Sequence, residues 1–237
     1  MKLIVDNIVK NFDKKEVLKN ASFTFKKGKI YGLLGRNGAG KTTLFNIISS
    51  EIEKTSGDIY IEENKEKRNL NPSDIGYVIS TPNVPSFLTG REFLKFFLDI
   101  NKNKINGLKT IDEYFDLIKI EKDDRDKLLK DYSHGMKNKM QMLINIILKP
   151  NVLLLDEPLT SLDVVVQEEM KDLLKDLKSN QIIIFSTHIM ELALSLCDEI
   201  VLLSNGVLEM IDKKHLTNQE LKNAIIDKLK DECNYEE

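Results

Sequence analysis

Residues 35–43 have the types and the spacing to bind phosphate groups. They fit the pattern G-x-x-x-x-G-K-[ST], in which glycines let the backbone turn tightly and aim successive amides at an anion. Lys41 supplies a positive charge for the β- and γ-phosphates, and the Thr42 hydroxyl suits Mg²⁺. The candidates for phosphate binding are Gly35, Asn37, Gly38, Ala39, Gly40, Lys41, Thr42 and Thr43.

The segments on either side of this loop have the patterns that such a loop needs. Residues 30–34 form an apolar run typical of a buried strand, and residues 44–48 indicate a helix. In this setting the first helical amides and the positive end of the helix dipole face the phosphates. The alternative is a glycine-rich turn with a chance lysine, and the flanking patterns argue against it.

Two carboxylates follow an apolar run later in the chain. Residues 152–155 lead directly into Asp156 and Glu157. A strand that emerges beside the phosphate loop places Asp156 near Mg²⁺ and lets Glu157 polarise an attacking water as a general base. The alternative is a strand that ends in solvated acids. The phosphate loop upstream favours catalysis.

Two further segments have residues suited to contact phosphates. Ser133 and Gly135 lie at the start of a predicted helix, where an anion can bind, although these residues taken alone favour an ordinary serine N-cap. His188 follows the apolar run 182–185, at the sheet edge where ligands bind in open α/β folds. It is placed to contact a γ-phosphate, although a lone histidine is more often a surface or core residue.

Composition narrows the classes of partner. The chain has 237 residues, enough for a large core, and a net charge of −3 without a basic block, so nucleic acid is not expected as a partner. Its two cysteines, Cys197 and Cys233, have no metal-binding spacing and fit a reducing cytoplasm. We find neither a signal peptide nor an apolar run near the ~20 residues of a membrane span. We therefore expect a soluble chain that reaches a membrane only through a partner.

The hydrophobic period divides the chain into four predicted units. Residues 1–85 form the first part of a nucleotide-binding core together with an antiparallel β-subdomain, and residues 86–148 form a helical subdomain. Residues 149–212 complete the core with continuous apolar runs, which are typical of parallel strands covered on both faces. Residues 213–237 form a short helix and an acidic tail.

Local signals predict several element boundaries. Thr89 with Glu92, and Thr217 with Glu220, form capping boxes that predict helix starts. Residues 164–177 indicate a helix, and residues 200–211 indicate a hairpin around the turn 204–206. The highly charged residues 62–71 predict a solvated loop.

Together these motifs resemble the nucleotide-binding subunit of an ATP-binding cassette (ABC) transporter, from about Leu3 to Ile211. Residues 35–42 match the Walker A motif, residues 152–156 match the Walker B motif, and Glu157 matches the catalytic glutamate. Residues 132–136 lie at the signature motif, and Ser161-Leu162-Asp163 matches the D-loop. His188 matches the switch histidine, and Phe12 falls where the family stacks an aromatic ring on adenine.

Three residues depart from the family pattern. Ser80 stands where the family has a glutamine that contacts Mg²⁺, and serine is too short to reach the metal in the same way. His134 replaces the first glycine of the family's L-S-G-G-Q, and Met136 replaces its glutamine. The Ser133 hydroxyl and the backbone amides, which contact phosphate in the family, are retained, so we expect a working but weaker contact.

The resemblance implies a fold and a site. The expected fold is α/β: a P-loop NTPase core, RecA-like and with a mainly parallel sheet, an N-terminal antiparallel β-subdomain and an inserted helical subdomain. The implied catalytic residues are Glu157, His188 and Lys41. The implied Mg²⁺ ligands are Thr42, Asp156 and Ser80. Outside the phosphate loop, the implied ATP-binding residues are Phe12, Ser133, Gly135 and Asp163.

The resemblance also implies partners. ATP would lie between residues 35–43 of one copy and residues 133–135 of a second copy in a head-to-tail homodimer. A polytopic membrane permease subunit would be driven through the helical unit, near Ser80 and Phe87. The chain would then be cytoplasmic and peripheral on the inner face of the cell membrane. The S-x-G-M-K form, with Thr81-Pro82, is similar to exporters of drugs or antimicrobial peptides.

Two other readings remain open at this point. A soluble ABC-type ATPase acting on nucleic acid or ribosomes usually has two cassettes or a long insertion, and this chain has one cassette. A GTPase would carry an N-K-x-D motif, which is absent, and a small-molecule kinase would not explain Ser133 and Gly135.

Overall fold

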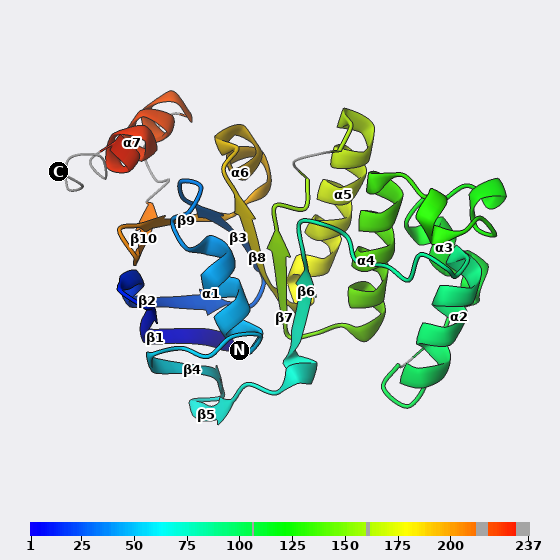
Figure 1. Ribbon diagram of the computed structural model, residues 1–237, viewed down its shortest axis with the longest axis horizontal. Helices are drawn as coiled ribbons and strands as arrows, with labels where there is room; N and C mark the ends of the chain where they lie inside the picture. The colour runs from blue at the N-terminus through cyan, green and yellow to red at the C-terminus, as the bar shows by residue number, and fades with distance from the viewer. Residues whose placement is uncertain (106, 160–161, 212–217, 231–237) are drawn as a thin grey trace.

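The computed structural model describes residues 1–105, 107–159, 162–211 and 218–230 (Figure 1). The strands are β1 (Lys2–Phe12), β2 (Lys15–Lys26), β3 (Lys29–Leu34), β4 (Ser56–Glu63), β5 (Glu66–Asn69), β6 (Ile75–Val78), β7 (Val152–Asp156), β8 (Ile182–Thr187), β9 (Glu199–Ser204) and β10 (Val207–Ile211). The α-helices are α1 (Lys41–Ile48), α2 (Gly90–Asn101), α3 (Ile111–Leu117), α4 (His134–Leu148), α5 (Val164–Leu177), α6 (Met190–Leu196) and α7 (Asn218–Lys230). Short 3₁₀ helices span Pro72–Asp74, Lys122–Asp124, Leu129–Asp131 and Lys178–Asn180.

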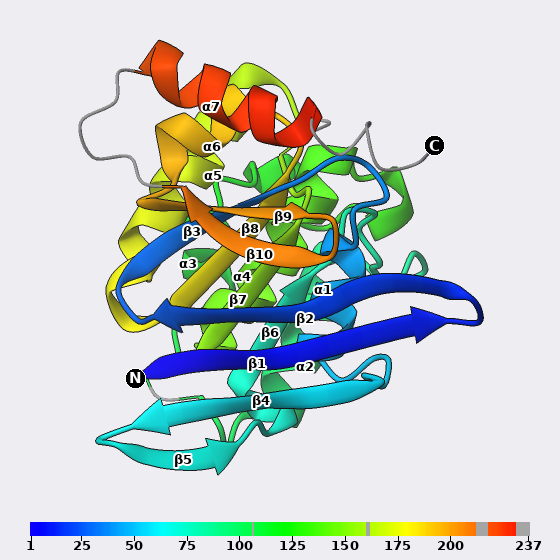
Figure 2. The same cartoon turned by 90° about the vertical axis from the view of Figure 1, so that its left-hand side faces the viewer.

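The described strands form two sheets. One is antiparallel, in the order β2-β1-β4-β5, and Figure 2 views it face on. The other has the order β10-β9-β3-β8-β7-β6 and is parallel except for the β9–β10 hairpin. The expected α/β class, the antiparallel β-subdomain and the hairpin at residues 200–211 are therefore confirmed. The boundaries of the four predicted units stay predictions.

The prediction of a solvated loop at residues 62–71 is wrong. Most of these residues belong to the β4–β5 hairpin, whose turn residues Asn64 and Lys65 have φ angles of 52° and 70°, as tight hairpin turns require. Glu62 lies opposite Lys67, whose ammonium lies 4.5 Å from the centre of the Tyr60 ring. The strand is charged because β5 is a sheet edge, where charges prevent further pairing.

Alternation along the central strands gives the larger sheet two apolar faces. Leu153, Leu155, Ile183 and Phe185 pack with residues of α4, α5 and α6. Val152, Leu154, Ile182 and Ile184 pack with residues of α1 and of the antiparallel sheet. Because side chains alternate, the next residues on the α1 face are Asp156 and Ser186, which pair in register on β7 and β8. Polar side chains thus reach the edge where α1 begins.

The segment from α2 to α4 has an apolar core of its own, made largely by Leu94, Phe115, Leu129, Met140 and Leu143. We call this segment, residues 86–148, the helical lobe, and Figure 1 shows its helices α2 and α3 at the end of the molecule remote from the antiparallel sheet. The predicted capping box is confirmed: the Thr89 hydroxyl accepts from the Glu92 amide, and the Glu92 carboxylate accepts from the Thr89 amide.

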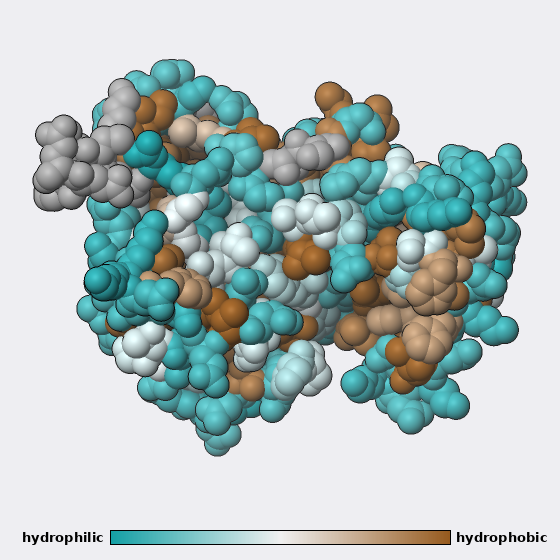
Figure 3. Space-filling view, viewed as in Figure 1, coloured by the Kyte–Doolittle hydropathy of each residue, from teal (hydrophilic) through white to brown (hydrophobic). Residues whose placement is uncertain are grey.

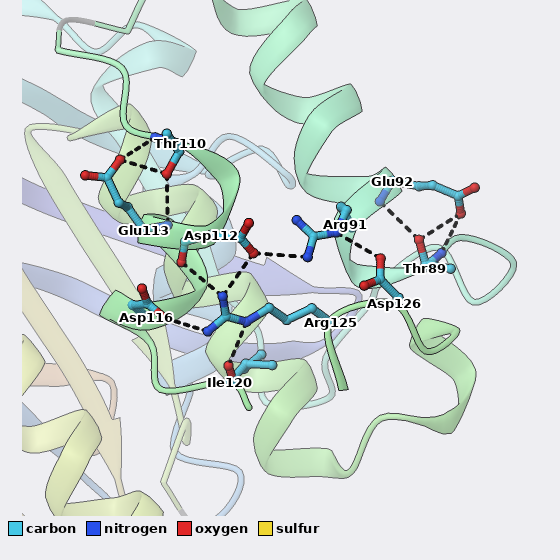
Figure 4. Close-up of polar contacts among 10 residues, drawn as sticks. All are labelled: Thr89, Arg91, Glu92, Thr110, Asp112, Glu113, Asp116, Ile120, Arg125 and Asp126. Atoms are coloured by element: carbon cyan, nitrogen blue, oxygen red, sulfur yellow. Dashed lines mark hydrogen bonds and ion pairs between the residues drawn. The ribbon is translucent and has the colours of Figure 1, made fainter. Parts of the chain in front are cut away.

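A buried arginine ties the helical lobe together (Figure 4). The Arg125 guanidinium donates to the Asp116 carboxylate at 2.5 Å, to the Asp112 carboxylate at 3.0 Å and to the Ile120 carbonyl at 3.1 Å. It also lies 5.4 Å from the centre of the Phe115 ring. Arg91 of α2 donates to the same Asp112, so the network joins α2, α3 and the chain that leads to α4.

Other predictions have mixed outcomes. The helix at residues 164–177 is confirmed as α5. Thr217, Ser161 and the acidic tail from Asp231 to Glu237 lie outside the described residues, so their predicted roles are not tested. Among the residues that are described, no helix has the length and apolar character needed to span a membrane.

Candidate functional site

The phosphate loop joins β3 to α1, in the strand–loop–helix order that the sequence predicts. Gly38 and Gly40 have φ angles of 84° and 104°, a left-handed region that favours glycine. A Cβ atom on Gly35 would lie 2.7 Å from the Leu203 carbonyl oxygen, so this position also has no room for a side chain. The glycine pattern is therefore set by the loop's own geometry.

Helix α1 begins differently from the helices of the lobe. Its N-cap, Gly40, provides no side-chain hydrogen bond, whereas Thr89 caps α2 and Ser133 caps α4. The first amides of a helix have no partner within the helix. At α1 they receive no side-chain cap and face the loop, an arrangement that suits an anion such as a phosphate.

Lys41 is held over the loop. Its ammonium donates to the Gly35 carbonyl at 2.8 Å and to the Arg36 carbonyl at 3.1 Å. Burial lowers the pKa of Lys41, and the nearby Glu157 and Asp156 carboxylates oppose that shift. A buried cation beside a row of backbone amides gives the loop the charge needed for a polyphosphate.

Hydrogen bonds run from the phosphate loop to the neighbouring strands. Thr42 Oγ1 donates to Asp156 Oδ2 at 2.8 Å, and Ser186 Oγ donates to Asp156 Oδ1 at 2.6 Å. The Glu157 amide donates to Ser186 Oγ at 3.1 Å. The Glu157 carboxylate lies 3.0 and 3.1 Å from His188 Nδ1. Groups from β7, β8 and α1 therefore form one connected polar system.

Thr42, Asp156 and Glu157 of this system border a pocket of about 330 Å³. It is lined by Phe12, Lys15, Val17, Asn37, Gly38, Gly40, Lys41, Thr42, Thr43, Asp156 and Glu157. Phe12 is 46% exposed, and the Lys10 ammonium lies 4.7 Å from its ring centre. The pocket has polar groups at the phosphate loop and an apolar wall at Phe12 and Val17, as a nucleotide with a flat base requires.

Several predicted site residues lie away from this pocket. Ser133 is exposed and caps α4, where its hydroxyl accepts from the Met136 amide, and its predicted contact with a phosphate of a second copy stays a prediction. Asp163 caps α5 in the same way. Ser80 is exposed and is not among the described residues that line the pocket. Gly135 follows Ser133 on the first turn of α4.

Sequence reasoning missed three residues at the site. Lys15 and Val17 line the pocket because β2 returns beside β1 directly after Phe12. Ser186 is fully buried and binds Asp156. The signal for Ser186 was available: a polar residue follows the apolar run 182–185, at the sheet edge that also carries Asp156.

The oxygen groups fit Mg²⁺. Among the described residues, no cluster of three or more histidine, cysteine, aspartate or glutamate side chains could hold a metal ion. Mg²⁺ does not need one, since it commonly binds one or two protein oxygens together with phosphates and water. The Thr42 hydroxyl and the Asp156 carboxylate, 2.8 Å apart beside the loop, supply such oxygens.

Comparisons with known proteins agree with this geometry. The family model described as ABC transporter matches residues 18–160. An uncharacterized ABC transporter ATP-binding protein of Methanocaldococcus jannaschii, MJ1023, is 35% identical over 207 residues, which cover 86% of this chain and 75% of that protein. The lantibiotic transport ATP-binding protein SrtF of Streptococcus pyogenes is 30% identical over 231 residues, with 93% and 94% covered.

Another relative and a solved structure extend the comparison. The probable sulfate/thiosulfate import ATP-binding protein CysA of Chlorella vulgaris is 31% identical over 210 residues, with 87% of this chain and 89% of that protein covered. A dimeric post-hydrolysis structure of the ATP-binding cassette MJ0796 with ADP and Pi covers 90% of this chain and 100% of that chain, with a TM-score of 0.75 and 23% identity. That likeness shows the fold. The family match shows more: the chain belongs to the ABC transporter family, as an ATP-binding ATPase subunit.

Proposed function

We propose that this subunit hydrolyses ATP between two copies arranged head to tail and thereby drives a polytopic membrane permease that exports its cargo. The observation that carries the proposal is the connected polar system of Thr42, Asp156 and Glu157 at the phosphate loop, with Ser133 exposed outside the same pocket. One copy supplies a phosphate loop and a base. A second copy supplies the remaining phosphate contact.

The chain's own groups have distinct tasks in hydrolysis. Lys41 and the first amides of α1 bind the phosphates. Thr42 and Asp156 would hold Mg²⁺, which neutralises phosphate charge when bound. Glu157 accepts a proton from the attacking water. His188, at 3.0 Å from the Glu157 carboxylate, orients that carboxylate and is placed to contact the terminal phosphate.

A second copy would complete the site. Ser133 and Gly135 begin α4, where the backbone amides and an exposed hydroxyl can meet a phosphate presented from outside. Val164 and Val165 at the start of α5 are 74% and 69% exposed, and Figure 3 shows hydrophobic surface at that end of α5. Such surface supports burial against a partner copy.

The helical lobe carries the surface proposed for the permease. Phe87 is 78% exposed, and Phe96 and Ile100 are exposed one turn apart on α2. Figure 3 shows hydrophobic surface over α2, one of several apolar patches in that view. Docking there would hold the subunit on the cytoplasmic face of a membrane. SrtF, a lantibiotic transport protein, supports export, and CysA, an import protein, makes direction the point to test.

The substitution Glu157→Gln tests the hydrolytic mechanism. The amide keeps the shape of the side chain and cannot accept the proton, so turnover should fall by about 10²–10⁴-fold. ATP binding should persist, and the variant should accumulate as a dimer with ATP, measured by light scattering after gel filtration. Turnover near that of the unchanged protein would refute the role of Glu157.

Copurification tests the transport role. The tagged subunit, expressed in its native cells and extracted in mild detergent, should retain a polytopic membrane protein. Phe87→Ser should weaken that retention while ATP turnover of the isolated subunit stays unchanged, because Phe87 is not among the described residues that line the pocket. Recovery of ribosomes or nucleic acid in place of a membrane protein would contradict the proposal.

A further inference from the structure

Ser186 occupies the junction between the two carboxylates of the site. It is fully buried near the end of β8, where it pairs in register with Asp156 of β7. The preceding residues on the same face of these strands are apolar, so Ser186 and Asp156 are the first polar pair along them. A hydroxyl at this position therefore has a specific set of partners.

The hydrogen-bond roles of the Ser186 hydroxyl are fixed. A carboxylate can only accept, so Ser186 Oγ donates its single proton to Asp156 Oδ1 at 2.6 Å. A backbone amide can only donate, so the same oxygen accepts from the Glu157 amide at 3.1 Å. Ser186 thus binds the side chain of one carboxylate residue and the backbone of the next.

The Glu157 backbone requires such support. Its φ angle is 50°, in the left-handed region that residues with a side chain rarely adopt. Its amide also bonds the Ser186 carbonyl, at 3.2 Å. Two acceptors on one residue hold this unfavourable conformation, which directs the Glu157 side chain toward His188.

We propose that Ser186 is a positioning residue that couples Asp156 to Glu157, so that the group suited to Mg²⁺ and the general base keep one fixed relation. This inference rests on the proposed function of those two carboxylates. With Thr42 on the other oxygen of Asp156, the coupling extends from the phosphate loop to His188. Loss of the hydroxyl removes one hydrogen bond from the Asp156 carboxylate and one from the Glu157 amide, and both carboxylates remain.

The test compares two variants at the same site. Ser186→Ala removes the hydroxyl, and Ser186→Cys keeps a similar shape with a much weaker donor. Turnover at saturating ATP should fall by about 10- to 100-fold in both, as misplaced catalytic groups cause. Affinity for a fluorescent ATP analogue in EDTA should stay within about twofold of the unchanged protein, while the gain in affinity on adding Mg²⁺ shrinks by about tenfold.

A second readout needs neither nucleotide nor metal. The Glu157 amide should exchange with deuterium faster in both variants, because one of its two acceptors is lost. The matched control is Thr187→Val, at the next fully buried hydroxyl, which accepts from the Ile189 amide and, among the described residues, forms no hydrogen bond with either carboxylate. It should lower thermal stability without changing the Mg²⁺-dependent gain in affinity or the Glu157 exchange rate.

The outcomes separate this inference from the proposed function. Ser186→Cys that keeps normal turnover and the full Mg²⁺ gain would overturn the coupling, as would an equal loss of that gain in Thr187→Val. Normal turnover in Glu157→Gln would instead refute the general base. Even if that role of Glu157 were refuted, the gain in nucleotide affinity on adding Mg²⁺ and the exchange rate of the Glu157 amide would still test the role of Ser186.

Discussion

Lys41 and Asp156 lie buried at the edge of the larger sheet, whereas Ser133 lies exposed at the start of α4. The first two already have hydrogen-bond partners in their own subunit: loop carbonyls for Lys41, and the Thr42 and Ser186 hydroxyls for Asp156. The Ser133 hydroxyl caps its own helix and faces outward. The sheet edge is preorganised within one copy, whereas Ser133 is the group that we propose the lobe presents to a second copy.

The two regions are also stabilised differently. The sheet edge rests on two apolar clusters that cover both faces of β7 and β8. The helical lobe has a smaller apolar core and adds the Arg125 network, in which one buried guanidinium holds Asp112 and Asp116, both largely exposed (Figure 4). Replacing a single polar residue of this network should therefore lower the stability of the lobe and leave the phosphate loop intact.

The largest expected effect tests this sensitivity. Arg125→Met keeps much of the buried stem but removes four hydrogen bonds, so we expect a loss of about 2–4 kcal/mol in the free energy of unfolding. Urea denaturation measures the loss. Hydrogen exchange should locate it in α2 and α3, with ATP affinity unchanged.

Arg91→Met is the matched control for that variant. Its guanidinium binds Asp112 and Asp126 but is about one-third exposed, so the loss should stay below about 1 kcal/mol. Equal losses in the two variants would contradict the view that burial of Arg125 stabilises the lobe. Weaker ATP binding in Arg125→Met would contradict the independence of the two regions.

An intermediate effect tests whether the lobe supplies half of a site. Ser133→Ala should leave ATP affinity of the single subunit unchanged and weaken ATP-dependent dimerisation by about tenfold, because one phosphate contact is lost. The measurement uses the Glu157→Gln background, where dimers accumulate. Thr110→Ala removes an equivalent helix cap in the same lobe, so it should cost similar stability, about 1 kcal/mol, without affecting dimerisation. If Ser133→Ala and Thr110→Ala dimerise equally well, Ser133 does not contribute to the shared site.

The sequence predicted the sheet edge better than the lobe's interior, for a physical reason. The phosphate loop, its flanking strand and helix, and the Thr89 cap depend on neighbours within a few residues, so their signals are local. Arg125 and Asp116 also lie close in sequence, yet nothing in their spacing shows that the guanidinium is buried against Phe115. That burial depends on how α3 packs.

Long-range pairing explains the other misses. Ser186 is 30 residues from Asp156, and only the β7–β8 register brings them together. The charges of strand β5 predict a loop because they suit solvent, and solvent is also where an edge strand lies. Periodicity identifies buried faces reliably but carries little information about an element that buries almost nothing.

The smallest expected effect concerns the ion pair between Arg68 and Asp74, in which the carboxylate is the buried partner. In the lobe the buried partner is the arginine, Arg125. Asp74 is buried and accepts hydrogen bonds from the half-exposed Arg68, from the Asn71 amide and from Asn151. Together these bonds hold the end of β5 to the larger sheet. The Arg68 guanidinium is the main cause that lowers the pKa of Asp74 to about 2. The buried partner here titrates, whereas a buried arginine does not.

The sign of the pH dependence follows from that shift. The folded pKa of Asp74 lies below its unfolded value of 3.8, so its contribution is complete above about pH 5 and is lost as pH falls through 4 toward 2. Asp74→Asn should therefore be less stable than the unchanged protein by about 1 kcal/mol at pH 6, discounted for the exposed Arg68. This difference in the free energy of unfolding should become smaller below pH 4, as measured by urea denaturation from pH 6 to pH 3. The stability lost in Arg125→Met should show no such pH dependence from the arginine itself. A gap in Asp74→Asn that stays constant with pH would show that Asp74 acts through packing alone.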